Sequence, residues 1–372
     1  MRRPKVLFVG RTRYLLPLPD HLARKWDALS ERMEVRVLAS GSGHDARFRL
    51  VPPRHLDGPR FYLSLPFEVA AELRSFRPDV VVAESPYEAV AVELARRAER
   101  SPAKLVVEVH GDWRTSTRLY GSRWRAPVAP VGDLLARWAV RSADGHRALS
   151  AFTASLVRAE GREPLGVFPT YSDLGAFSGP PAPMPAEPRA LFVGVLERYK
   201  AVDVLAAAWR LVAARLPAAR LRLVGMGTET AVAEALVREG AEWDRRLAPA
   251  GVAAALDGAR VLVLPSPAEG LGRVAIEAFL RGRPVVGTRA GGIPDVVEHG
   301  RTGLLVAPGD VYGLADSIER MLVEPGLAEQ MGQAARAASA AWLSSPEEFA
   351  ERVLAVVQAV TGRPVAPPAG DA

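Results

Sequence analysis

Two glutamates eight residues apart, Glu269 and Glu277, could bind the hydroxyl groups of a ligand. Glu269 precedes the segment 270–272, whose two glycines allow backbone N–H groups to approach a bound group. Glu277 lies among the apolar residues Val274, Ala275, Ile276, Ala278, Phe279 and Leu280. A helix that is apolar all round is buried, and a buried carboxylate needs a polar partner. Stabilisation by the helix dipole alone would suit a solvated helix better, so we expect Glu277 to bind a ligand.

The elements that position this pair follow from the apolar pattern around it. Residues 260–264 form an apolar strand, and Pro265–Pro267 cannot continue a central strand. A helix is expected from about 272 to 282, followed by a second strand over 284–288. This order is typical of a parallel α/β sheet, in which ligands bind at the carboxyl ends of strands.

The same region resembles a known enzyme family. Glu269 and Glu277, followed in order by Gly291–Val297 and Gly300–Val306, are similar to the motifs of the retaining, nucleotide-sugar-dependent glycosyltransferases of family four. The resemblance implies the α/β fold called GT-B, with two Rossmann-like, doubly wound domains facing a cleft. In that family the first domain binds an acceptor and the second a nucleotide-diphospho-sugar.

The length of 372 residues also suggests two domains. A proline-rich, nearly uncharged stretch near residue 180 predicts a linker. We expect an N-terminal domain over 1–178, a linker over 179–188 and a C-terminal domain over 189–345. An amphipathic helix over 346–362 is placed to cross back to the first domain, as in the family.

Local patterns give further expectations for the first domain. Residues 5–9 predict a buried strand, and residues 10–14 a loop at its carboxyl end. Residues 41–59 are rich in glycine, proline and histidine, which favours a loop. A helix is expected over 65–76.

Charge and cysteine content restrict the class of protein. Residues 1–178 hold 28 Lys and Arg against 20 Asp and Glu, a net charge of +8, while the whole chain carries +6. The basic half indicates an anionic acceptor or a membrane face, with a solubility feature as the alternative. No nucleic-acid-binding motif accompanies the charge. The absence of cysteine excludes disulfides and thiolate chemistry. With no signal or membrane-spanning segment, we expect a cytoplasmic protein, peripheral on the membrane if its acceptor is a lipid.

The family resemblance assigns roles on the donor side. The loop 194–200 corresponds to a diphosphate site, where Lys200 matches the usual lysine and Val195 replaces the usual arginine. Arg198 could supply the missing charge. The resemblance implies that Glu269 and the backbone of Gly270, Leu271 and Gly272 hold the sugar, while Glu277 binds the ribose.

On the acceptor side, the resemblance places His110 beside the transferred sugar. Asp112 could orient His110 or bind the acceptor. Arg11 and Arg13 stand where the family usually has a pair of glycines, in a loop that meets the acceptor. No two aspartates stand two residues apart, so the metal-binding Asp-x-Asp of the other main glycosyltransferase fold is absent. We therefore expect no metal and no other cofactor.

The resemblance implies a retaining hexosyltransferase, in which the acceptor attacks the sugar from the face that the diphosphate leaves. The acceptor is a sugar, a glycan or a lipid-linked molecule. An anionic or membrane-borne acceptor is suggested by the basic and aromatic stretch 114–125. Two alternatives stay open. One is a sugar-nucleotide epimerase or a phosphorylase on the same fold, and the other is a catalytically silent module that binds a sugar nucleotide.

Overall fold

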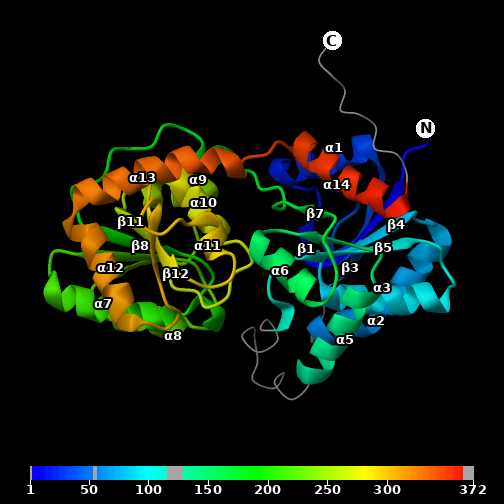
Figure 1. Cartoon of the computed structure of the whole chain (residues 1–372), viewed down its shortest axis with the longest axis horizontal. Coiled ribbons are helices and arrows are strands. Elements are labelled where there is room, and N and C mark those ends of the chain that lie inside the picture. The colour runs from blue at the N-terminus through cyan, green and yellow to red at the C-terminus, as the bar shows by residue number, and fades with distance from the viewer. Residues whose placement is uncertain (1, 53–56, 115–128, 363–372) are drawn as a thin grey trace, which may run out of the picture. The chain divides into compact units, whose positions relative to one another are not determined.

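The computed structural model describes residues 2–52, 57–114 and 129–362, which fall into two compact units (Figure 1). Unit 1 contains the described residues up to 114 together with 129–172 and 344–362. Unit 2 contains residues 173–343.

Unit 1 is built on a parallel sheet, which has seven strands within the described residues, in the order β3-β2-β1-β4-β5-β6-β7. Its strands are β1 (Lys5–Leu15), β2 (Glu34–Ser42), β3 (Phe48–Val51), β4 (Val80–Ala83), β5 (Lys104–Val109), β6 (Gly145–Ala148) and β7 (Gly166–Val167). The strand order reverses between β1 and β4. A ligand site is expected at the carboxyl ends of the strands around such a reversal.

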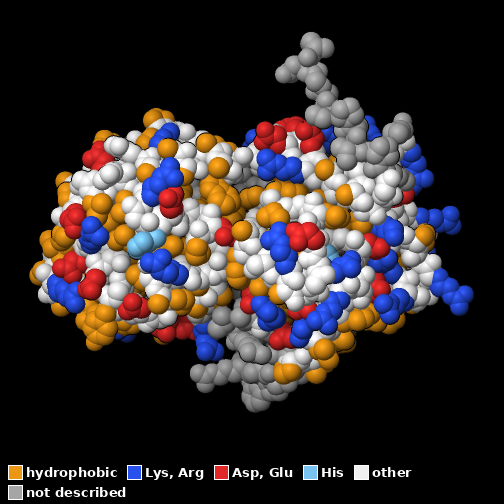
Figure 2. All heavy atoms as spheres, viewed as in Figure 1, with side chains coloured by type: hydrophobic (Ala, Val, Ile, Leu, Met, Phe, Trp, Pro, Cys, Tyr) orange, Lys and Arg blue, Asp and Glu red, His pale blue; other side chains and the backbone are white. Residues whose placement is uncertain are grey.

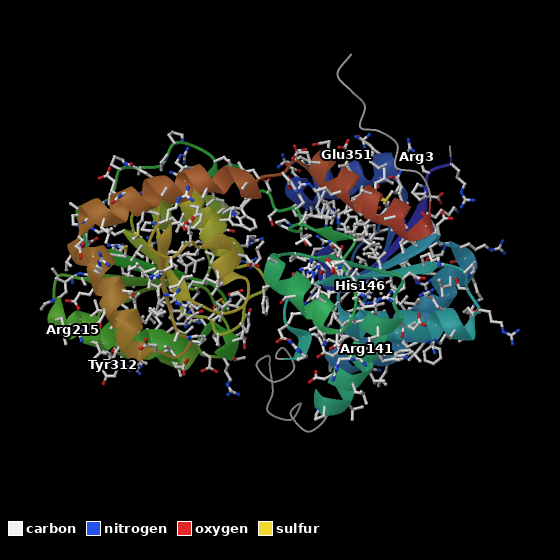
Figure 3. All side chains as sticks on the ribbon, viewed as in Figure 1. Arg3, Arg141, His146, Arg215, Tyr312 and Glu351 are labelled. Atoms are coloured by element: carbon white, nitrogen blue, oxygen red, sulfur yellow. The ribbon has the colours of Figure 1, made fainter. Side chains whose placement is uncertain are left out.

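Helices cover both faces of this sheet because side chains along a strand point alternately to opposite sides. The described helices of unit 1 are α1 (Asp20–Arg32), α2 (Asp57–Ser75), α3 (Pro86–Ala98), α5 (Ala129–Ser142), α6 (Ala151–Ala159) and α14 (Pro346–Thr361). Leu7 and Val9 of β1 belong to the core under α2, α3 and α5, whereas Val6 and Phe8 belong to the core with α1 and α14. Glu351 of α14, labelled in Figure 3, accepts a hydrogen bond from Arg32 of α1 at 2.9 Å.

Unit 2 repeats this plan with a parallel six-stranded sheet in the order β10-β9-β8-β11-β12-β13. Its strands are β8 (Arg189–Val193), β9 (Arg220–Val224), β10 (Glu242–Asp244), β11 (Val261–Leu264), β12 (Val285–Thr288) and β13 (Gly303–Val306). Its helices are α7 (Val202–Arg215), α8 (Thr230–Arg238), α9 (Pro249–Asp257), α10 (Arg273–Leu280), α11 (Ile293–Val296), α12 (Val311–Val323) and α13 (Pro325–Ser339). Short 3-10 turns are η2 (Gly175–Phe177), η3 (Arg198–Lys200) and η4 (Ala340–Trp342). The prediction of two doubly wound α/β domains is confirmed.

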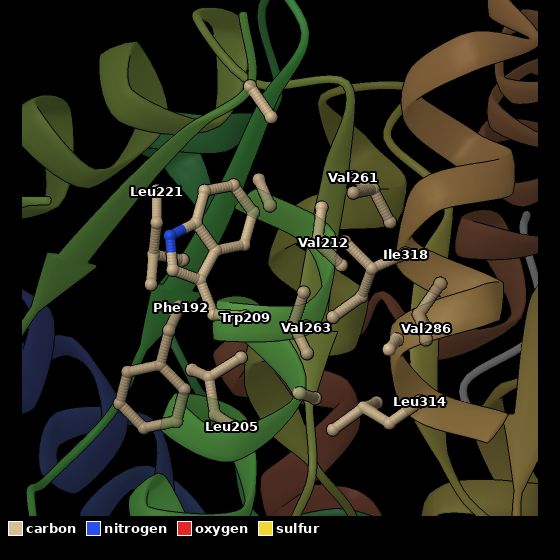
Figure 4. Close-up of a cluster of buried hydrophobic side chains, with 14 of the residues drawn as sticks. Phe192, Leu205, Trp209, Val212, Leu221, Val261, Val263, Val286, Leu314 and Ile318 are labelled. Carbon is tan, nitrogen blue, oxygen red and sulfur yellow. The ribbon is translucent and has the colours of Figure 1, made fainter. Parts of the chain in front are cut away.

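One face of the second sheet is filled by large apolar side chains (Figure 4). Phe192 and Val263 come from neighbouring strands, and Trp209, Val212 and Ile318 come from α7 and α12. All five are at most 4% exposed. Burial of each such side chain contributes about 1.5–3 kcal/mol, which makes this sheet a rigid base for the loops at its edge.

Three local expectations for unit 1 are wrong. The strand β1 continues to Leu15 with a register shift between Val9 and Arg13, so the expected loop 10–14 is part of a strand. The expected loop 41–59 contains β3, a short edge strand that pairs with β2. Helix α2 begins at Asp57 and carries Pro66 in its interior, where proline is disfavoured, so the local sequence favoured a later start.

The proline-rich stretch expected as a linker lies against unit 2. Arg281 donates hydrogen bonds to the carbonyl oxygens of Gly179 (3.1 Å) and Pro180 (3.0 Å). Arg283 donates in the same way to Ala182 and Pro183, and Arg260 to Pro185. The three arginines are at most 8% exposed. They donate hydrogen bonds to backbone carbonyl oxygens that have no partner strand in a sheet. These hydrogen bonds hold the proline-rich segment against unit 2 just before β8.

Candidate functional site

The donor-side candidates lie at the edge of unit 2 where the strand order reverses. The loop 194–200 follows β8 and the loop 265–272 follows β11, and these two strands are neighbours in the sheet. At a reversal of strand order the connecting loops diverge to opposite sides and leave room for a ligand. The fold therefore brings both predicted donor loops to one place within unit 2.

Lys200 and Glu269 form an ion pair across these loops. Lys200 donates from Nζ to Oε1 of Glu269, and Ser266 donates from Oγ to the same oxygen at 3.1 Å. Both side chains of the ion pair are 12% exposed. A partly desolvated ammonium next to a carboxylate presents one group suited to a phosphate and one suited to sugar hydroxyls. The structure thus places two of the predicted site residues in direct contact.

Two glycines of the segment 291–297 hold the Glu269 loop in position. The backbone N–H of Gly292 donates to the carbonyl oxygen of Glu269 at 2.9 Å. A Cβ atom on Gly291 would lie 2.2 Å from that same oxygen, and one on Gly292 would lie 2.2 Å from the carbonyl oxygen of Gly270. Gly291 also has a positive φ of 57°. Only glycine allows the two backbones to approach this closely.

Glu277 lies on α10 and is 7% exposed, as its apolar neighbours predicted. It forms an ion pair with Arg273, one turn earlier, at 3.0 Å between Nε and Oε1. The protein itself therefore supplies one polar partner for the buried carboxylate. The Arg273 side chain is 65% exposed, so the pair is open to solvent on one side. Burial raises the pKa of Glu277, although the nearby Arg273 partly offsets this.

The other donor-side candidates lie in the two loops that carry Lys200 and Glu269. Gly272 has a positive φ of 77° and is the residue before α10, while Leu271 is buried in an apolar cluster of unit 2. Arg198 is exposed on η3, the 3-10 turn that also carries Lys200. Val195 is 45% exposed in the same loop, so a side chain at this position reaches solvent.

Three of the four acceptor-side candidates line a pocket of about 500 Å³ in unit 1, and Asp112 is not among its lining residues. Arg11 and Arg13 come from β1, and His110 follows β5. The other lining residues are Thr12, Ser40, Tyr62, Glu84, Ser85 and Glu88. As in unit 2, the pocket lies at the strand ends where the order reverses, here beside β1 and β4. The structure brings Arg11, Arg13 and His110 together.

Two carboxylates in this pocket were missed by the sequence reasoning. Glu84 accepts a hydrogen bond from Thr12 at 2.8 Å and lies so close to Gly10 that a Cβ atom there would overlap it. Glu88 is 3% exposed and accepts from Tyr62 at 2.9 Å. Burial raises the pKa of Glu88 despite this hydrogen bond. The position of Glu84 directly after a buried strand was a usable signal, whereas nothing in the sequence linked Tyr62 to Glu88.

His110 is in contact with Glu108, another residue that the sequence reasoning missed. Its Nε2 lies 2.9 Å from Oε2 of Glu108, whose other oxygen accepts from Arg147 at 2.8 Å. Asp112 accepts hydrogen bonds from the backbone N–H and the Nε of Arg114. Glu108 is thus a carboxylate that contacts the His110 ring, and the roles expected for Asp112 stay predictions.

Two family models match this chain. The model described as glycosyl transferases group 1 matches residues 187–324, and the model described as a glycosyl transferase 4-like domain matches residues 20–170. A 163-residue stretch is 38% identical to D-inositol 3-phosphate glycosyltransferase of Pseudarthrobacter chlorophenolicus. This match covers 41% of the chain and 39% of that relative, so it extends over less than half of either protein.

Solved structures match over nearly the whole chain. Sucrose-phosphate synthase from Thermosynechococcus elongatus superposes with a TM-score of 0.78 at 20% identity, covering 96% of this chain and 99% of that one. Anabaena HepE in complex with UDP and glucose gives 0.67 at 19% identity, covering 94% and 98%. At these identities the likeness establishes the fold, which is GT-B.

Proposed function

Because the chain belongs to the group 1 glycosyl transferases, we propose that it transfers a hexosyl unit from a nucleotide-diphospho-sugar to an acceptor, with retention of configuration. The observation that carries this proposal is the Lys200–Glu269 pair at the reversal point of the second sheet. Glu277 lies on the helix that leaves the same loop. Lys200 suits the diphosphate of such a donor. Glu269 suits its sugar, and the buried Glu277 suits its ribose.

In the proposed reaction, the bond between the sugar C1 and the diphosphate oxygen breaks, and the acceptor oxygen bonds to C1 on the same face. The acceptor hydroxyl gives its proton to the departing diphosphate. Lys200, with Arg198 on the same turn, stabilises the charge that grows on that diphosphate. We propose that this needs no metal and no other cofactor.

A screen of nucleotide-sugars by thermal shift tests the proposal. A donor present at 100 times its Kd stabilises the folded state by about 2.7 kcal/mol, which corresponds to a rise in Tm of about 5–10 °C. The hit is then incubated with and without candidate acceptors, and release of nucleoside diphosphate is measured. Acceptor-dependent release supports a transferase. Conversion of the donor without an acceptor would indicate an epimerase, and binding without turnover a silent module.

We further propose that the acceptor is anionic or lipid-linked and that unit 1 binds it at a cytoplasmic membrane surface. Arg11 and Arg13 supply cationic groups in the pocket. Leu63 and Phe67, one turn apart on α2, are 75% and 77% exposed. Apolar side chains also appear in Figure 2 on the outer surface at α5, where Val131 and Leu134 are exposed. No helix within the described residues is long and apolar enough to span a bilayer.

Sedimentation with anionic and neutral vesicles at low and high salt tests this surface. The arginines Arg118, Arg123 and Arg125, on which the expectation first rested, lie outside the described residues. Changing them together to Gln is expected to reduce binding to anionic vesicles, by about 1 kcal/mol for each arginine.

Leu63→Ser with Phe67→Ser should weaken binding to vesicles at both low and high salt, because salt does not screen the insertion of apolar side chains. Tyr312→Ser, which removes a 69% exposed aromatic from unit 2, is the matched control. Equal recovery with both vesicle types would contradict an anionic membrane surface, and no recovery with either type would contradict membrane binding.

A further inference from the structure

A buried ion pair lies behind His110 in unit 1. Glu108 of β5 and Arg147 of β6 are direct cross-strand partners in the parallel ladder, so their side chains emerge on the same face. Their side chains are only 8% and 2% exposed. A buried pair of this kind contributes little net stability, because removing both charges from water costs about as much as their attraction returns. Its presence calls for another explanation.

The guanidinium of Arg147 makes three hydrogen bonds and contacts two aromatic rings. It donates from Nε to Glu108 at 2.8 Å, from Nη1 to the carbonyl oxygen of Phe168 at 3.0 Å and from Nη2 to Oγ1 of Thr170 at 3.0 Å. The ring centroids of Phe168 and Phe349 lie 4.9 and 5.7 Å from its Cζ. The guanidinium is therefore a fixed anchor for the carboxylate of Glu108.

The second oxygen of Glu108 is directed at His110. Burial alone would raise the pKa of Glu108, but Arg147 and His110 outweigh it and hold that pKa well below its usual range. An ionised carboxylate can only accept hydrogen bonds, so the Nε2 of His110, 2.9 Å away, must carry the proton. In the neutral ring Nδ1 is then a hydrogen-bond acceptor. His110 is 40% exposed and lines the pocket.

We propose that Arg147 and Glu108 are positioning residues that hold His110 in its Nε2–H tautomer, so that Nδ1 accepts a hydrogen bond from a substrate hydroxyl in the unit 1 pocket. The role given to Nδ1 rests on the proposed function. The tautomer follows from the contacts within unit 1 alone.

The test is a long-range proton–nitrogen NMR spectrum of the full chain labelled with ¹⁵N-histidine. The sequence has six histidines, and His110→Asn identifies the signals of His110. At about pH 8.5, two units above the ordinary value for imidazole, the wild type should show a protonated Nε2 and an unprotonated Nδ1. The Arg147 side chain can only donate hydrogen bonds, so in the Glu108→Gln variant it is expected to donate to the carbonyl oxygen of the new amide. The new NH₂ group then faces Nε2, and we expect the proton to move to Nδ1.

The matched control is Glu72→Gln, also a carboxyl-to-amide change at a buried unit 1 glutamate that accepts hydrogen bonds from arginine. Because Glu72 binds Arg36 and Arg49, this variant should keep the wild-type tautomer of His110. In turnover, Glu108→Gln should lower kcat/KM about 2- to 12-fold, the loss of one neutral hydrogen bond, with nucleotide affinity unchanged. A protonated Nδ1 in the wild type would overturn the proposal, and this measurement needs no variant to fold. An unchanged tautomer in folded Glu108→Gln would overturn it too. Absence of any turnover in the wild type would instead count against the proposed function.

Discussion

Replacing Lys200 with alanine is expected to lower kcat by about 10²- to 10³-fold, the effect of removing one preorganised group that stabilises charge in a transition state. Donor affinity should fall much less, because the negative charge on the diphosphate is larger in the transition state than in the bound donor. Lys200 is placed for this role by η3, which holds it against Glu269 at the edge of the second sheet. Steady-state kcat and KM, with nucleotide binding measured separately, distinguish the two effects.

Lys104→Ala provides the matched control for this experiment. Lys104 also pairs with a carboxylate, Asp144, at 3.1 Å, but the pair lies in unit 1 and the lysine is 46% exposed. Its loss should leave kcat near the wild-type value. If Lys200→Ala raises only the KM for the donor, Lys200 is a binding group and the proposed role in turnover is wrong.

Glu277→Gln is expected to weaken nucleotide binding by about 1.5–3 kcal/mol, the contribution of a hydrogen bond to a charged group. This corresponds to an increase in Kd of about 10- to 150-fold. The buried carboxylate is the stronger acceptor for ribose hydroxyls, and the amide presents one acceptor oxygen where the carboxylate presents two. Isothermal titration with the nucleoside diphosphate measures the change.

The Glu277→Gln variant should bind nucleotide more weakly without any loss of folding stability at pH 7. Because the pKa of Glu277 is raised in the folded state, its ionisation disfavours folding at pH values above that raised pKa. The penalty disappears as the pH falls below the ordinary carboxyl value of 4.5. A glutamine is neutral at every pH, so Glu277→Gln should keep or raise the Tm at pH 7 and show no gain at pH 4.

The exposed Glu298 supplies the control in the same unit. Glu298 pairs with Arg301 at 2.7 Å and its side chain is 59% exposed. Glu298→Gln should change neither nucleotide affinity nor the pH dependence of the Tm. Unchanged nucleotide affinity in a folded Glu277→Gln protein would refute the ribose contact.

The local sequence determined the elements around the donor site. The apolar strand before Pro265 and the apolar helix around Glu277 are properties of adjacent residues, and the structure has both as β11 and α10. The doubly wound fold of both units was implied by the family resemblance of these motifs, and the structure has it in both sheets. Burial of Glu277 was predictable because its apolar neighbours cover every side of one short helix.

The tertiary structure decided which charged groups meet. Lys200 and Glu269 are 69 residues apart in sequence and pair because β8 and β11 became neighbours at the reversal of the sheet. Glu108 and Arg147, 39 residues apart, meet through the register of β5 and β6, and a shift of one residue would separate them. Three buried arginines likewise attach the proline-rich segment to unit 2, although nothing local distinguishes them from surface arginines. Strand order and register depend on the packing of the whole domain, so the partner of a charged side chain is determined only when the domain folds.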